Sequence, residues 1–414
     1  MKTKKTIDNL GIMKKRYAFL PVFGLIIAIA RSSQASGNHF TTLDFPGAIG
    51  TDVSGISGST LFGRYTDTNG LSPAFIYNGS TFTTVLYPGT DGGQTASTIV
   101  TGVSGKTVFG EHYVNFGPYH GFIYDGSTYR NFDGPGAVET QVGGVSGGNV
   151  VGSYAVNDPY TTYHGFIYNG STFTTLDVPG AMETYAIGIS GATVVGYYQN
   201  PDGTDHGFIY DGTTFKTLDA PGAPQGANLG TFAWGVSGGT VIGYSGNSTR
   251  GPGFLYNGST FTTLDFPGVG ATATFASGVS GGTVVGSYNG TDGIYDGFIY
   301  DGLTYTTLDF PGASSTSLAD ISGNSVVGSY TQLGTSHGFI AQVPEPLPRI
   351  SLTTSNSLVI SWPYPSIGCN LQQNSDLATT NWVTPSNTIA NDGTNNFIVA
   401  APSSGKLFFR VSHP

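Results

Sequence analysis

Short runs of alternating apolar and polar residues, separated by turn residues, fill the chain from about residue 39 onward. One stretch shows the pattern in full, with runs at 140–146, 150–154, 165–168 and 173–178. Each run contains residues such as Val, Ile, Phe, Tyr or Thr and is bounded by Gly, Asn, Asp or Ser, as is typical of short β-strands joined by tight turns. The pattern therefore predicts an all-β protein.

The four-strand unit is repeated seven times, with about 44 residues in each repeat. The third strand carries a Gly-Phe-Ile-type sequence, whose phenylalanine recurs at Phe75, Phe122, Phe166, Phe208, Phe254, Phe298 and Phe339. Six repeats join the third and fourth strands by Asn-Gly or Asp-Gly, dipeptides that readily adopt the positive φ angles of a two-residue hairpin. Repeated four-stranded units of this length predict the blades of a β-propeller.

The two ends of the repetitive region predict how it closes. An isolated fourth strand at 40–45 opens the region, and the seventh repeat has no fourth strand of its own. We expect the first strand to complete the last blade, because a closed ring hides the sheet edges that a linear solenoid has to cap. Residues 39–343 are therefore predicted to form a seven-bladed β-propeller closed by an N-terminal strand.

The segments outside the repeats have a different composition. A basic cluster precedes an apolar run at 17–30, and small residues follow, so residues 1–35 are predicted to be a signal peptide. The apolar run is short for a membrane span, so we expect no membrane-spanning segment after the signal peptide is cleaved. The signal peptide predicts a secreted or cell-surface protein of the bacterial envelope type. Residues 344–348 form a Pro-rich linker, and the alternation in 349–414 predicts a small β-sandwich.

Charge narrows the range of partners. Residues 1–35 hold seven of the 15 basic residues and one of the 25 acidic residues, so the remainder carries eight basic against 24 acidic residues, a net charge of −16. This balance argues against nucleic acid as a partner. The single cysteine excludes an internal disulfide, so packing has to hold the fold together.

The repeats resemble a known family. Gly-x-Ser-Gly and Val-Val-Gly-Ser segments accompany a His-Gly-Phe motif at His120, His164, His206 and His337, and together they resemble the extracellular repeats called HAF. The resemblance covers 39–343 and implies secretion and a propeller-like body, but it brings no catalytic residues. The C-terminal region is similar to the terminal β-domains of large secreted bacterial proteins, through Ser361-Trp362-Pro363, Asn381-Trp382 and Phe408-Phe409-Arg410.

Recurrent polar residues predict structural roles. The four histidines lie on third strands, where equivalent points on neighbouring blades are on the order of 15 Å apart, too far to share a metal ion. Aspartates that end the fourth strand are expected to accept hydrogen bonds at the Pro-Gly turn, namely Asp44, Asp133, Asp177, Asp219, Asp265 and Asp309. No metal site or cofactor is predicted. The oxygen-rich turns 67–70 and 202–205 could hold calcium, but neither contains a full ligand set.

We expect the first strand of each repeat to line the channel. Most of its positions hold similar residues in every repeat, but a few positions differ from repeat to repeat. The variable positions include Gln141, Tyr185, Phe232, Trp234 and Phe275. Aromatic rings in a weakly charged, concave site suit stacking on sugars. These five residues are the predicted ligand-binding residues; the alternative is that they pack between blades.

Three functions follow. The leading hypothesis is a secreted, non-enzymatic binding or scaffold protein whose propeller contacts an extracellular glycan or protein. The alternative is a carbohydrate-active hydrolase or lyase, which needs two carboxylates about 5–9 Å apart. Asp52 and Asp320 are the carboxylates predicted on first strands, in blades that ring closure makes neighbours. The third hypothesis is a purely structural cell-surface protein.

Overall fold

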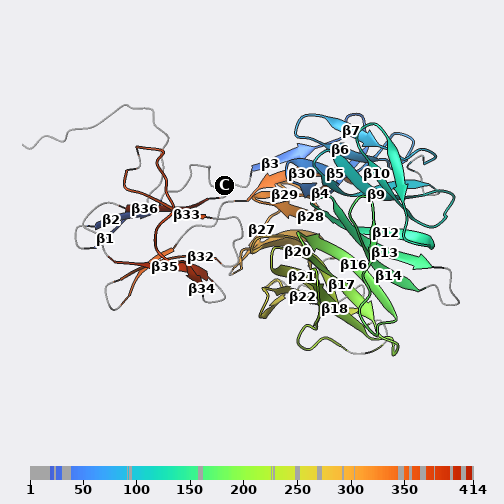
Figure 1. The fold of residues 1–414 in the computed structure, drawn as a ribbon. Helices are drawn as coiled ribbons and strands as arrows, with labels where there is room; N and C mark the ends of the chain where they lie inside the picture. Colours follow the sequence, from blue (N-terminus) through green and yellow to red (C-terminus); the bar gives the residue numbers. More distant parts are fainter. Residues whose placement is uncertain are drawn as a thin grey trace, which may run out of the picture. The chain divides into compact units, whose positions relative to one another are not determined.

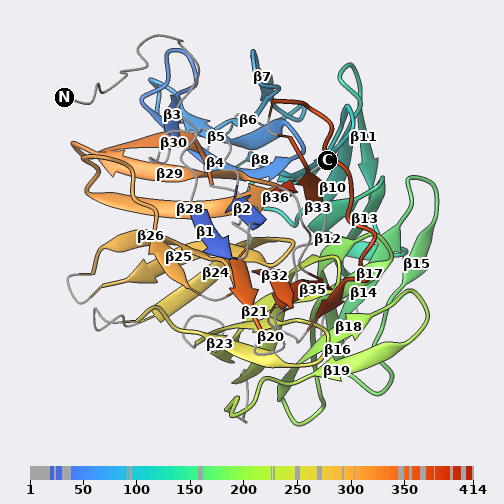
Figure 2. The ribbon, with the colours of Figure 1, turned by 90° about the vertical axis from the view of Figure 1, so that its left-hand side faces the viewer.

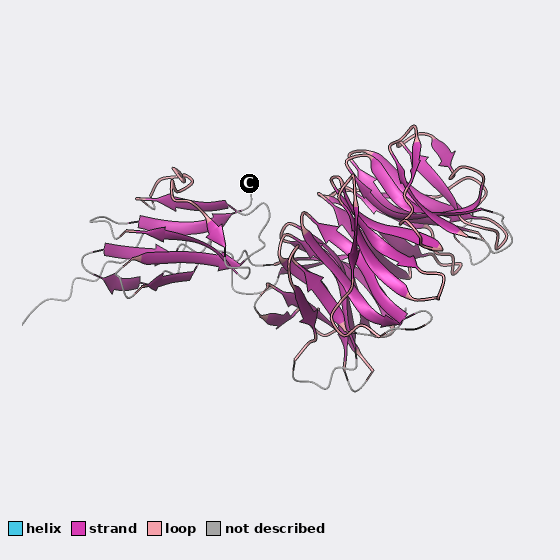
Figure 3. Cartoon of the chain, turned by 60° about the horizontal axis from the view of Figure 1, so that its bottom comes forward, coloured by secondary structure: helices cyan, strands magenta, loops and turns pink. Residues whose placement is uncertain are grey.

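The computed structural model describes most of the chain after residue 38 and two short segments before it. The described residues are 19–22, 25–29, 39–90, 92, 96–156, 162–224, 226, 229–247, 252–267, 273–290, 293–302, 304–343, 349–353, 357–363, 370–376, 378–391, 395–401 and 407–412. All regular secondary structure in them is β-strand, which confirms the all-β prediction (Figure 3). This part of the chain contains no apolar helix of membrane-spanning length.

The chain forms two compact units. The first comprises residues 38–343 with the short segment 365–367, and the second comprises residues 1–37, 344–364 and 368–414. The boundary at residue 343 agrees with the end of the repeats in the sequence. The predicted linker at 344–348 lies outside the described residues.

The first unit is a succession of short antiparallel strands (Figure 1). Its strands are β3 (His39–Leu43), β4 (Gly50–Ser57), β5 (Thr60–Thr66), β6 (Ala74–Tyr77), β7 (Phe82–Val85), β8 (Ser97–Ser104), β9 (Thr107–Tyr113), β10 (His120–Tyr124), β11 (Tyr129–Phe132), β12 (Ala137–Ser146), β13 (Asn149–Val156), β14 (Tyr163–Tyr168), β15 (Phe173–Thr175), β16 (Glu183–Ser190), β17 (Thr193–Gln199), β18 (Asp205–Tyr210), β19 (Phe215–Leu218), β20 (Leu229–Ser237), β21 (Thr240–Asn247), β22 (Gly253–Tyr256), β23 (Phe261–Leu264), β24 (Ala273–Ser280), β25 (Thr283–Asn289), β26 (Tyr295–Tyr300), β27 (Tyr305–Thr307), β28 (Ser315–Ser322), β29 (Ser325–Gln332) and β30 (Thr335–Gln342).

These strands pair in fours. The orders are β4-β5-β6-β7, β8-β9-β10-β11, β12-β13-β14-β15, β16-β17-β18-β19, β20-β21-β22-β23, β24-β25-β26-β27 and β28-β29-β30-β3. A single parallel bridge between Asp205 and Gly230 links β18 to β20 and joins two of these groups into one larger sheet. Four-stranded sheets that recur along the chain are the architecture of β-propellers.

Local sequence explains the hairpins. In the turn between β6 and β7, Gly79 has a φ of 94°, a conformation that glycine adopts without steric cost. The Asn78 side-chain oxygen accepts hydrogen bonds from the backbone N–H groups of Ser80 at 3.0 Å and Thr81 at 2.9 Å. The Asn-Gly and Asp-Gly dipeptides therefore act as predicted, with the first residue fixing the turn and the second supplying the positive φ.

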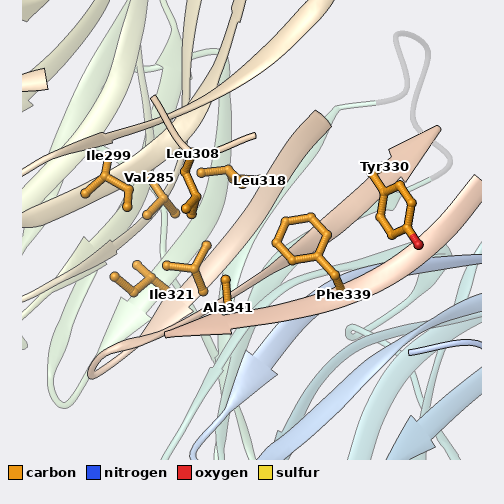
Figure 4. Packing of buried hydrophobic residues seen from close by; sticks show 9 residues of the cluster. Val285, Ile299, Leu308, Leu318, Ile321, Tyr330, Phe339 and Ala341 are labelled. Carbon is orange, nitrogen blue, oxygen red and sulfur yellow. The ribbon is translucent and has the colours of Figure 1, made fainter. Parts of the chain in front are cut away.

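The hydrophobic core lies between successive sheets. The third-strand phenylalanines are at most 2% exposed in every repeat. One cluster combines Val285 and Leu308 of one sheet with Leu318 and Phe339 of the next (Figure 4). Burying each such side chain contributes about 1.5–3 kcal/mol. Apolar residues on both faces of the strands are thus explained, because each sheet is covered on both sides.

The last sheet returns to the first. β3 pairs antiparallel with β30, with Phe40 opposite Ala341, as the sequence predicts (Figure 2). Each first strand lies beside the first strand of the next sheet, and β28 lies beside β4. The backbone N–H of Val53 in β4 donates a hydrogen bond to Ser329 Oγ in β29 at 3.1 Å. Residues almost 300 positions apart therefore form ordinary sheet-to-sheet contacts.

The second unit holds two four-stranded sheets. Their strands are β31 (Arg349–Leu352), β32 (Leu358–Pro363), β35 (Asn395–Ala400) and β34 (Ala390–Asn391) in one sheet, and β1 (Phe19–Val22), β2 (Leu25–Ile29), β36 (Leu407–Ser412) and β33 (Asn370–Asn374) in the other. Trp362, which is 2% exposed, packs with Ile360, Leu371 and Phe409 from both sheets. Trp362 is therefore a core residue. β1 and β2 lie within the segment predicted to be a signal peptide.

Candidate functional site

One edge of the sheets in the first unit gathers the non-repeating side chains. Because neighbouring strands are antiparallel, the first and third strands begin at this edge, and the second and fourth strands end there. We call it the loop face. It comprises the starts of β4, β8, β12, β16, β20, β24 and β28 with the adjoining strand ends and loops. The opposite edge carries the tight turns between first and second and between third and fourth strands.

Three of the chain's four glutamates lie at the loop face, on the second, third and fourth sheets. Glu139 in β12 accepts hydrogen bonds from Gln141 Nε2 at 2.7 Å and from the Tyr163 hydroxyl at 3.2 Å. Glu183 in β16 accepts a hydrogen bond from the Tyr185 hydroxyl at 2.7 Å. Tyrosine hydroxyls and carboxylates therefore alternate along this part of the loop face.

Glu111 links the second sheet to the third. It lies in β9, and its Oε2 accepts a hydrogen bond from the backbone N–H of Val142 in β12 at 2.9 Å. In three other repeats this position is occupied by serine, and two of these serines, Ser287 and Ser329, accept the equivalent hydrogen bonds. Burial, with a smaller contribution from the negative charge of Glu139, raises the pKa of Glu111 to about 7. The carboxyl of Glu111 is therefore partly protonated near neutral pH.

A chain of ring contacts runs from these carboxylates across the next two sheets. Its centroid distances are 5.2 Å for Tyr163–Tyr185, 4.7 Å for Tyr185–Tyr197, 5.0 Å for Tyr197–Phe232, 5.0 Å for Phe232–Tyr244 and 6.4 Å for Tyr244–Trp234. We call these six residues the ring chain. Asp205 is 4% exposed, and its negative charge acts on Tyr197 and Tyr244. Its carboxylate accepts a hydrogen bond from Gln199 Nε2 at 3.3 Å.

The environment of the ring chain is poorly solvated and negative. Burial raises the pKa of Tyr185, and its hydrogen bond to the Glu183 carboxylate raises it further. Burial also raises the pKa of Tyr197 and of Asp205. These tyrosines therefore stay protonated as hydroxyl donors, and a cluster of perturbed groups on one face is typical of a functional site.

The five predicted ligand-binding residues fall into different environments. Trp234 is 48% exposed, Tyr185 and Gln141 are partly buried, and all three lie on the ring chain or bind its carboxylates. Phe232 is 3% exposed and its ring contacts Tyr197 and Tyr244, so its environment agrees with the alternative of packing between blades. The ring centroids of Phe275 and Tyr295 are 6.3 Å apart, and neither residue belongs to the ring chain.

The structure does not bring the Asp52 and Asp320 carboxylates together. Asp320 Oδ2 accepts a hydrogen bond from the Ile56 N–H at 3.1 Å, and Oδ1 accepts one from the Ile321 N–H at 2.8 Å. Asp52 is exposed and accepts a hydrogen bond from the Ser336 hydroxyl. Because Asp52 precedes Ile56 by four residues on one strand, roughly 13 Å along it, the two carboxylates are too far apart for a hydrolytic pair.

Asp320 has a structural task instead. It stands where the other first strands have a glycine at the register shift, as at Gly278, whose added Cβ would lie 2.8 Å from Asp320 Oδ1. Its carboxylate bridges β28 to β4, and burial raises its pKa to about 6. Asp320 therefore fixes the junction between the last sheet and the first.

Four of the recurrent aspartates hydrogen-bond to a histidine side chain rather than to the Pro-Gly turn. The Nδ1–Oδ distances are 3.2 Å for His120–Asp133, 2.8 Å for His164–Asp177, 2.9 Å for His206–Asp219 and 3.0 Å for His337–Asp44. The N–H near the Pro-Gly turn is instead donated to a threonine, as from Val178 to Thr184 Oγ1 at 3.1 Å. The expected turn role of the aspartates is therefore wrong for these four, and the histidines have the structural role that the spacing predicts.

The oxygen-rich turns use their carboxylates internally. Asp67 Oδ1 accepts hydrogen bonds from the N–H groups of Asn69 and Leu71, and Asp202 Oδ1 accepts them from the N–H and hydroxyl of Thr204. The hydrogen bond from Leu71 is the main cause that lowers the pKa of Asp67. Among the described residues, no group of three His, Cys, Asp or Glu side chains could hold a metal ion.

Sequence reasoning missed Glu111, Glu139 and Glu183. It started the first strand of the third repeat at Thr140, whereas β12 starts at Ala137 and β16 starts at Glu183, so both later glutamates are on first strands. The available signal was composition. Glu139 and Glu183 stand at a position that other repeats fill with Gly, Ser or Ala, and Glu111 stands at one that they fill with Ser, Tyr or Arg. In a chain with 10% charged residues, each glutamate therefore marks a departure from the framework.

Comparisons with known proteins bear on the fold. The chain is similar to prolyl endopeptidases (13% identity, TM-score 0.51, 78% of this chain and 55% of that chain). It is also similar to the β-propeller domain of the Trilobed protease from Pyrococcus furiosus (10%, 0.47, 71% and 95%) and to a six-bladed β-propeller fungal lectin from Aleuria aurantia (15%, 0.37, 65% and 97%). No family model and no curated protein matches the chain. At these identities the likenesses concern the fold alone.

Proposed function

We propose that this chain is a secreted or cell-surface glycan-binding protein of the HAF-repeat type, with its binding site at the loop face. The first unit is a seven-bladed β-propeller in which β3 completes the last blade, and the second is a β-sandwich that serves as an attachment or spacing module. The pairing of β3 with β30 and the contact of β28 with β4 support the closed ring. The basic and apolar composition of residues 1–35 supports secretion.

The observation that carries the proposal is the exposed Trp234 ring at the end of the ring chain. A half-exposed tryptophan on an inner strand is costly to hydrate and flat enough to stack on the apolar face of a sugar. Its neighbour Tyr244 and the partly buried Tyr185 extend the aromatic surface. Glu139, Glu183 and Gln141 add acceptors and a donor for sugar hydroxyl groups.

Glycan arrays test the proposal. The purified protein is applied to a broad array beside Trp234→Ala and the control Val383→Ala, since Val383 is 56% exposed and belongs to the second unit. We expect Trp234→Ala to lose at least tenfold in affinity, because burying one large apolar side chain against a ligand contributes on the order of 1.5–3 kcal/mol. Val383→Ala should bind as the parent does. Equal binding by both variants, or binding to no glycan, would refute the proposed site.

A carbohydrate-active hydrolase is the second candidate, and Glu111 favours it. A carboxyl with a pKa of about 7 beside a second carboxylate, Glu139, has the protonation behaviour of a general acid. One Glu111 oxygen is held by the Val142 N–H, which leaves the other for proton transfer. Release of reducing ends from a bound polysaccharide, abolished in Glu139→Gln, would establish this activity. Unchanged chain length after prolonged incubation would exclude it.

A further inference from the structure

We propose that the glycan bound at the loop face is a polycation, a polysaccharide of amino sugars whose amines are free. This inference rests on the proposed glycan binding and adds the charge of the ligand. Two independent features of the loop face support it: the exposed apolar side chains that surround it, and the distribution of fixed charge between the two faces of the first unit.

With the exception of Trp234, the exposed apolar side chains of the first unit lie at the loop face. Among the described residues of the first unit, the large hydrophobic residues that are at least 38% exposed are Ile49, Val114, Phe116, Val138, Met182, Trp234, Ile294, Tyr295 and Leu333. Apart from Trp234 on β20, each lies in a loop or at a strand start on this face. Apolar exposure restricted to one face marks an interaction surface, and the apolar faces of sugar rings can cover it.

Fixed charge is unevenly divided between the two faces. Four described basic residues belong to the first unit, and Lys106, Arg130 and Lys216 lie in or next to the tight turns of the opposite face. Arg64, near the end of β5, is the one at the loop face. Among the described residues, no lysine or arginine forms a salt bridge with Glu139, Glu183 or Asp205. His206, which is paired with Asp219, is the basic side chain whose charge acts on Asp205. A ligand on this surface therefore gains from positive charge, and an anionic polysaccharide is repelled.

The ring chain places carboxylates beside aromatic faces. Tyr163 and Tyr185 are 5.2 Å apart between ring centroids, and each donates its hydroxyl to a glutamate, Glu139 and Glu183 respectively. An ammonium group between such groups gains from the carboxylate and from the aromatic face together. A basic peptide could supply the charge but not the flat rings that match Trp234, so the observations favour amino sugars.

Binding of two matched oligosaccharides tests the charge. Calorimetry of the full chain compares a glucosamine hexamer with its fully N-acetylated form at about pH 5.5, where the amines are protonated and ordinary carboxylates are ionised. We expect the free-amine form to bind at least about tenfold more tightly, and the difference to shrink with added salt. Glu183→Gln should remove most of the preference, whereas Asp125→Asn on the opposite face should retain it, because Asp125 is engaged in its own turn.

The outcomes separate the two proposals. Equal affinity for both hexamers, or a preference unchanged in Glu183→Gln, would overturn the polycation inference and leave glycan binding intact. Binding of neither hexamer, with no hit on the array, would overturn both. A lysine hexamer that binds as tightly as the glucosamine hexamer would overturn the inference in favour of a basic protein partner. Hydrogen exchange of Glu183→Gln matched to the parent would confirm that the variant is folded.

Discussion

Replacing Glu111 by Gln should remove a pH-dependent loss of stability from the first unit. Burial is the main cause that raises the pKa of this carboxyl from the usual 4.5 to about 7. A difference of about 2.5 pH units corresponds to roughly 3 kcal/mol in the free energy of unfolding. Gln keeps a side-chain oxygen that can accept the Val142 N–H, so the substitution changes charge more than packing.

The sign follows from proton binding. Because the folded-state pKa is raised, the folded protein holds this proton between pH 4.5 and 7, where the unfolded chain releases it. The stabilising contribution of Glu111 is therefore complete below pH 4.5 and is lost as the pH rises through 7. Relative to Glu111→Gln, the parent should lose roughly 3 kcal/mol between about pH 4.5 and pH 8.

Two measurements check this. Urea unfolding of both proteins at several pH values gives the difference in free energy of unfolding. NMR of protein labelled with ¹³C-glutamate gives the Glu111 midpoint directly, and four glutamates make the carboxyl spectrum simple. Glu139→Gln should lower the Glu111 midpoint, because the charge of Glu139 raises it. A Glu111 midpoint below about 5, or parallel pH profiles for parent and Gln variant, would refute the reasoning.

Two further predictions concern stability. Thr184→Val should lower the free energy of unfolding by about 1–3 kcal/mol in urea titrations, because Val178 N–H loses its acceptor at a buried site; an unchanged midpoint would contradict the role of this threonine. Deleting residues 39–43 removes the strand that pairs with β30, so we expect a lower thermal midpoint and proteolytic cleavage within β28–β30. Equal protease resistance in the deletion variant would argue against closure by β3.

The sequence determined the local structure of the repeats. Asn-Gly and Asp-Gly fixed the hairpins, because few other dipeptides adopt the required φ angles. Phe75 and its six equivalents identified the buried strand, and they are at most 2% exposed. An unpaired strand at one end and a missing strand at the other predicted the pairing of β3 with β30. The turn dipeptides and the phenylalanines recur along the chain, so the prediction made for one repeat is supported by the same pattern in the others.

Tertiary structure alone decided which variable residues meet. Phe232 and Trp234 are two residues apart on one strand, yet one is 3% and the other 48% exposed, because packing against Tyr197 covers only the first. Asp52 and Asp320 lie on adjacent strands but at different heights, so their carboxylates serve separate partners. Glu111, Glu139 and Glu183 come together only because successive sheets place a second strand beside the next first strand. The local sequence pattern determines where strands and turns form, whereas the contact between sheets determines which side chains share a site.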